Sequence, residues 1–155
     1  MKTDTSKVLL LDLNVLLAIA WPNHQFHRAA VKAVSPAHVR WATCAVTQLG
    51  FIRLSSNPSV MAAAKPPAEA AAMLRALVAD PGHIYLKEAQ PPAGPDFQSV
   101  CARLLGHRQV TDAYLLLLAR QSGAIFTTFD KRLAGLAEPD TTVEVLGDPY
   151  SPSTL

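Results

Sequence analysis

Three aspartates could do chemistry together, and around the first of them, Asp12, no neighbouring residue is placed to neutralise the charge. Asp12 interrupts the apolar run "LLLDLNVLLAIA", Asp112 follows "RQVT", and Asp130 follows "AIFTTF". Two carboxylates within about 4 Å of each other repel by roughly 4 kcal/mol at an effective dielectric near 20, and a bound cation removes that cost. Oxygen ligands without His or Cys nearby favour Mg²⁺, with Mn²⁺ as a substitute, and Mg²⁺ also accepts phosphate oxygens. The three residues therefore predict metal-dependent phosphodiester hydrolysis, with all three as metal ligands and catalytic residues.

Each aspartate also has a structural explanation when it is taken alone. Asp112 lies in the first turn of a predicted helix, where a carboxylate gains about 0.3–1 kcal/mol from the helix dipole. Asp130 precedes "KRLAGL" and is placed to cap that short helix, and Asp12 is placed to cap a helix that begins near Asn14. Only their convergence in the fold favours a functional site over three separate caps.

The elements that must position these residues alternate between strand and helix. The apolar runs are solid rather than alternating, which is typical of a parallel sheet covered on both faces. We expect strands over 7–13, 38–43, 83–88, 124–130 and 142–146, and helices over 23–34 (with Asn23 as its cap), 44–54, 66–80, 96–106 and 111–123. Asp12 and Asp130 then end strands, at the edge where open parallel sheets carry their functional crevice.

Length and composition favour one globular domain. The chain has 155 residues, of which 50% are hydrophobic and 17% charged, so a largely disordered protein is excluded. We expect a single domain over 1–147 and a loose tail over 148–155. The net charge of +2 tolerates an anionic partner without requiring one.

Targeting signals and cysteine usage favour a cytoplasmic protein without membrane association. The N-terminal segment lacks a small-residue cleavage site, and no apolar stretch approaches the roughly 20 residues of a membrane span. Cys44 and Cys101 show no metal-binding spacing and are expected to be buried free thiols in a reducing compartment.

Four segments in order resemble a known family. "LLLDLNVLLA", "TQLGFIRL", "VTDAYLLLLAR" and "TTFDKRLAGL" are similar to the motifs of PIN-domain proteins, specifically the VapC toxins of bacterial toxin–antitoxin pairs. The resemblance implies a three-layer α/β/α sandwich around a mostly parallel sheet of about five strands. It also implies a metal-dependent endoribonuclease toxin that acts on structured RNA such as tRNA or ribosomal RNA, forms a homodimer and is held inactive by a VapB-type antitoxin. Asp12, Asp112 and Asp130 match family acids, and Asn14 matches the polar residue that orients the first acid or a water.

One position departs from the family pattern. Gln48 stands where a glutamate is usual, and its amide brings no negative charge. One hypothesis is an active enzyme in which Gln48 lines the cleft and metal affinity is reduced. The alternative is a catalytically weakened module that only binds RNA or the antitoxin.

Basic residues accompany each acidic segment. Phosphate contacts are predicted for Arg53, Arg108, Lys131 and Arg132, although an ordinary solvated surface explains each of them equally well. The hydroxyls of Thr127 and Thr128 are expected to hold the last acid, with Thr128 also near the substrate. Rival classes fit less well: "DLN" lacks the second aspartate of a phosphotransfer pair, and a DNA flap nuclease needs a longer chain.

Overall fold

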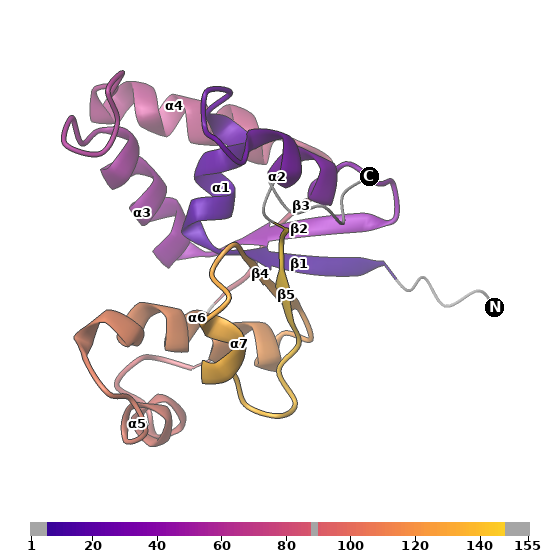
Figure 1. Ribbon diagram of the computed structural model, residues 1–155, viewed down its shortest axis with the longest axis vertical. Coiled ribbons are helices and arrows are strands. Elements are labelled where there is room, and N and C mark those ends of the chain that lie inside the picture. The colour runs from indigo at the N-terminus through magenta and orange to yellow at the C-terminus, as the bar shows by residue number, and fades with distance from the viewer. Residues whose placement is uncertain (1–5, 88–89, 148–155) are drawn as a thin grey trace.

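Five strands form one parallel sheet in this computed structural model, which describes residues 6–87 and 90–147 (Figure 1). The strand order is β3-β2-β1-β4-β5, and neighbouring strands of this sheet run parallel to each other. The strands are β1 (Lys7–Leu11), β2 (Val39–Thr43), β3 (His83–Tyr85), β4 (Ile125–Thr128) and β5 (Val143–Val145). The predicted α/β class with about five strands is confirmed.

Helices cover both faces of this sheet and make three layers (Figure 1). One layer holds α1 (Leu13–Ala20), α2 (His27–Val34), α3 (Ala45–Ser55) and α4 (Pro67–Val78). The other holds α5 (Pro95–Cys101), α6 (Val110–Gln121) and α7 (Leu133–Leu136), with the short 3₁₀ helix η1 (His107–Gln109) leading into α6.

The central strand supplies both cores because its side chains alternate between the faces. Leu9 and Leu11 pack with the α1 and α2 side, whereas Leu10 packs with the leucines of α6. All three leucines are at most 1% exposed. This double burial explains why β1 is a solid apolar run, and it fixes the end of the strand at Asp12.

The first helix is the main difference from the predicted elements. The expected strand extends to residue 13 and the next expected helix begins at Asn23, whereas α1 starts directly after Asp12 and α2 starts only at His27. The alternative role of Asp12 as a helix cap is therefore confirmed. Asn23 does not cap α2, since Phe26 precedes that helix without a side-chain bond. The change from strand to helix is hard to see in the sequence, because both elements are buried and apolar and only Asp12 separates them.

Close packing also explains a glycine inside a helix. A Cβ on Gly50 of α3 would lie 2.7 Å from a Leu13 methyl carbon of α1. Only the missing side chain permits this approach. Gly50 therefore leaves room for the Leu13 side chain between the two helices that follow β1 and β2.

Smaller differences concern lengths and exposure. The helix expected over 96–106 ends at Cys101, and β3 ends at Tyr85, while residue 88 lies outside the described residues. Cys44 and Cys101 are both free as expected, but Cys101 is exposed rather than buried. None of the helices in the described part of the chain has the length and apolarity that crossing a membrane requires. The expected tail over 148–155 is outside the described residues, and the 1–147 domain boundary stays a prediction.

Candidate functional site

The sheet topology brings the three aspartates to one edge. β1 and β4 are neighbours, and the Asp12 amide donates to the Thr127 carbonyl at 2.9 Å, so Asp12 lies beside the end of β4. Asp130 follows β4 by two residues, and Asp112 lies in the first turn of α6. Asp112 interacts electrostatically with both other carboxylates, which shows that the three share one neighbourhood.

Asp12 is a buried carboxylate that also caps α1. One oxygen, Oδ1, accepts from the Leu13 amide at 2.7 Å, and Oδ2 accepts from the Thr128 hydroxyl at 2.7 Å. Burial raises the pKa of Asp12, with a smaller contribution from Asp130, whereas the Thr128 and Leu13 bonds lower it. Because burial outweighs both bonds, the folded protein holds a charge here that its own groups only partly stabilise.

Thr128 links the first acid to the last. Its hydroxyl donates to Asp12 and accepts from the Asp130 amide at 3.0 Å, and the residue has no exposed surface. Of the two threonine hydroxyls expected to hold the last acid, that of Thr128 does contact Asp130, through its amide. The expectation is wrong for Thr127, whose hydroxyl donates to the Ile125 carbonyl instead. In this arrangement Thr128 positions Asp12 and has no surface with which to touch RNA.

The pKa of Asp112 is strongly raised by its surroundings. Burial, followed by the charges of Asp12 and Asp130, raises its pKa from 3.8 to about 6, and Arg132 opposes this shift. A divalent ion would relieve this setting, in which a half-buried carboxylate has two acidic neighbours and is only partly compensated by Arg132.

Asp12 and Asp112 face one cavity of about 330 Å³. Asn14 of α1 and Arg53 of α3 also line it, both with exposed side chains. The remaining lining residues are Leu13, Val46, Thr47, Thr111 and Leu115. The cavity therefore combines two carboxylates, an amide, a guanidinium and hydroxyls.

Asp130 belongs to the same acidic group, but its carboxylate is already bound by Arg132 of the same loop. Its Oδ1 accepts from the Arg132 amide at 2.9 Å and from Nε at 3.0 Å, and its Oδ2 accepts from Nη2 at 2.9 Å. These bonds lower the pKa of Asp130. Asp130 is accordingly ionised but already engaged.

The donor set fits Mg²⁺ as a site built on two carboxylates. No group of three His, Cys, Asp or Glu residues within the described ranges is arranged to hold a metal ion. Mg²⁺ commonly binds through one or two carboxylates and completes its shell with waters and substrate phosphates. Asp12 and Asp112 meet that need because both line the cavity, whereas the Asp130 carboxylate is bound by Arg132.

Gln48 is engaged outside this cavity. Its amide nitrogen donates to the Thr43 hydroxyl at 3.0 Å, which is itself bonded to Nε2 of His83 at 2.7 Å. Gln48 is not among the described residues that line the cavity of Asp12 and Asp112, so the hypothesis that it lines this cleft is not supported.

The predicted cations differ in their relation to the site. Arg53 lines the cavity, Arg132 holds Asp130, Lys131 is exposed beside them, and Arg108 is exposed on η1. Sequence reasoning missed Thr47 and Thr111. Thr111 directly precedes Asp112, which was an available signal, whereas nothing in the local sequence marks Thr47.

Known proteins share this arrangement of sequence and fold. The family model described as "PIN domain" matches residues 9–139. The chain belongs to the PIN-domain family. Ribonuclease VapC38 of Mycobacterium tuberculosis is 41% identical over 141 residues, covering 88% of this chain and 96% of that protein. Ribonuclease VapC39 of the same organism is 40% identical over 141 residues, covering 88% and 98%.

A solved structure shares the fold at low identity. It is the crystal structure of VapBC2 from Rickettsia felis bound to a DNA fragment from their promoter. The match has a TM-score of 0.58 at 10% identity and covers 90% of this PIN-domain chain and 99% of that chain. At this identity the likeness supports the fold alone, in agreement with the three layers of Figure 1.

Proposed function

We propose that this PIN-domain chain is a VapC-type endoribonuclease toxin that hydrolyses phosphodiester bonds in structured RNA, tRNA or ribosomal RNA, with Mg²⁺ or Mn²⁺. The observation that carries the proposal is the pair Asp12 and Asp112, two acids with raised pKa values at one cavity. The relatives named ribonuclease, which align over most of the chain, support the reaction class.

Each residue of the cavity has a defined task in this proposal. Asp12 and Asp112 would hold the metal, and a bound divalent ion would supply activation of a water and neutralisation of the charge on the phosphorus. Thr128 fixes one Asp12 oxygen so that this carboxylate keeps its direction. Asn14 orients the entering water through its exposed amide. Arg53, which lines the same cavity, binds a phosphate oxygen of the RNA.

The partners and location follow the same relatives. We infer that a VapB-type antitoxin neutralises the protein, that the protein is a homodimer and that it acts in the cytoplasm. Relatives with the name VapC and a structural neighbour that is a VapBC2 complex support the antitoxin. Arg108, Lys131 and Arg132 extend the phosphate-binding surface beyond the cavity.

RNA cleavage by purified protein tests this function. Wild type is expected to cut total cellular RNA when Mg²⁺ or Mn²⁺ is present and to stop when EDTA is added. Asp12→Asn and Asp112→Asn should both abolish cleavage, and sequencing of the new ends identifies the RNA and the cut site. Arg75→Gln, which changes an exposed residue of α4, is the control for folding and purity.

The non-catalytic alternative makes the opposite prediction. The observation in its favour is that Gln48 brings an amide where the family has a carboxylate, and that this amide is bonded to Thr43. A protein of this kind binds RNA or antitoxin but leaves RNA intact at every metal concentration. Cleavage that survives purification and disappears in Asp12→Asn would exclude it.

A further inference from the structure

The Asp130 carboxylate has little capacity left for another cation. An ionised carboxylate offers about four lone-pair positions. The amide, Nε and Nη2 of Arg132 occupy three of them at 2.9–3.0 Å. The residue that the family resemblance assigns to metal binding is thus bound to a guanidinium of its own chain.

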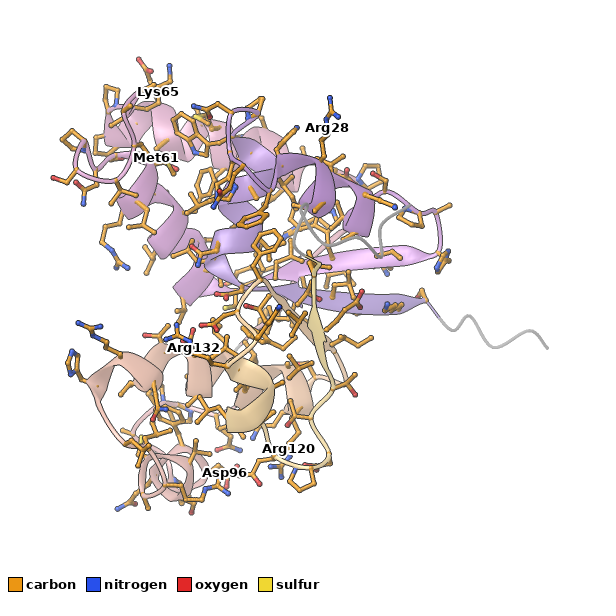
Figure 2. All side chains as sticks on the ribbon, in the orientation of Figure 1. Arg28, Met61, Lys65, Asp96, Arg120 and Arg132 are labelled. Atoms are coloured by element: carbon orange, nitrogen blue, oxygen red, sulfur yellow. The ribbon has the colours of Figure 1, made fainter. Side chains whose placement is uncertain are left out.

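Arg132 is well placed to change partners. Its side chain is 90% exposed, and ion pairs in such positions contribute little to stability, so the fork opens at small cost. Its charge also reaches Asp112. Figure 2 shows Arg132 between the side of the molecule that carries α1 and α3 and the side that carries α6 and α7. A phosphate bound near Asp12 and Asp112 would lie within the influence of the same guanidinium.

We propose that Arg132 is a resident counter-cation that competes with the divalent metal for Asp130 and transfers to an RNA phosphate when substrate binds. This inference rests on the proposed function. In the resting protein only Asp12 and Asp112 are available to a metal. RNA removes the guanidinium from Asp130, and the released carboxylate joins the other two, so the full set of ligands is assembled only around substrate.

Metal affinity without RNA tests the competition directly. Mn²⁺ is titrated into wild type, Arg132→Gln and Arg132→Lys, and free Mn²⁺ is measured by electron paramagnetic resonance. Arg132→Gln is expected to bind Mn²⁺ about three- to tenfold more tightly, because a weak exposed pair and one repelling charge are both removed. Arg132→Lys keeps the charge but cannot form the fork, so its gain should be smaller.

A double-mutant cycle assigns the gain to Asp130. If the guanidinium acts by closing that carboxylate, Arg132→Gln in an Asp130→Asn background should bring no tightening. Arg75→Gln removes the same charge from α4 and should leave Mn²⁺ affinity unchanged. An unchanged or weaker Mn²⁺ affinity in Arg132→Gln, or a gain that survives Asp130→Asn, overturns the competition.

Binding of bulk tRNA in EDTA tests the transfer. Arg132→Gln is expected to bind several-fold more weakly than wild type, whereas equal affinity refutes the transfer to phosphate. Failure of the proposed function has a different signature. If Asp12→Asn and Asp112→Asn leave Mn²⁺ binding of the wild-type background unaltered, there is no metal site at these acids, and both proposals fall. If they abolish binding while Arg132→Gln behaves as wild type, only the present inference fails.

Discussion

Replacing Asp112 by asparagine should make the protein more stable near neutral pH. The folded protein raises the pKa of this carboxyl from 3.8 to about 6, so it disfavours the charged form. A shift of about two units corresponds to roughly 3 kcal/mol, and solvent screening of this half-buried group reduces it to about 1.5 kcal/mol. The asparagine side chain removes that cost because its amide stays neutral, and it preserves the size of the original side chain.

The way in which the free energy of unfolding changes with pH identifies the ionisation of Asp112 as the cause. A group whose folded pKa is raised stabilises the fold below its unfolded pKa, and this stability is lost as pH rises through the folded value. The variant and wild type should therefore be equally stable near pH 4, diverge between pH 4 and 6, and differ by the full amount above pH 6. Urea unfolding at several pH values measures the free energy of unfolding of both proteins.

A matched control and a metal titration complete the experiment. Asp96 is exposed and accepts one bond from Gln121, which an asparagine can keep, so Asp96→Asn should change stability by less than about 0.5 kcal/mol. Saturating Mg²⁺ should stabilise wild type and close its gap to Asp112→Asn. A variant less stable than wild type at pH 7.5, or a gap that does not grow with pH, would refute the reasoning.

Three further substitutions test the surrounding structure. Gln48→Glu places its carboxylate beside Thr43 and outside the cavity, so calorimetry should detect an unchanged Mg²⁺ affinity, and tighter binding would show that this position does reach the metal. Thr128→Val removes the hydroxyl bonded to Asp12 and should destabilise the fold by about 1–3 kcal/mol in urea unfolding, with a further rise of the Asp12 pKa measurable by NMR. Gly50→Ala places a carbon 2.7 Å from a Leu13 methyl carbon, so the end of that side chain must change its rotamer. Thermal unfolding should report a loss of about 0.5–1.5 kcal/mol, and the loss should be smaller in a Leu13→Ala background.

The layout of the acids was predictable because it depends on topology. Asp12 and Asp130 follow apolar runs that had to be parallel strands, and parallel strands deliver their carboxyl ends to one edge. Asp112 could be placed in the first turn of a helix because the residues that begin and end that helix are recognisable. These inferences need only the order of the elements, which the pattern of apolar residues and breakers supplies.

Side-chain directions could not be predicted in the same way. Nothing in "FDKRL" distinguishes Arg132, which turns back onto Asp130, from Lys131, which lies exposed beside it. The bond from Gln48 to Thr43 joins a helix to the preceding strand, and a rotamer choice decides it. The start of α1 was concealed because strand and helix share one apolar run.

The Thr128 hydroxyl makes the site dependent on the register of two strands. Thr128 reaches Asp12 only because Leu11 is paired with Thr127, and a shift by one residue would turn that hydroxyl to the opposite face. β4 follows β1 by more than a hundred residues along the chain. The Asp12 carboxylate therefore gains its fixed direction only when this distant strand has paired with β1, so the orientation of the first acid depends on a long-range contact and not on its own segment.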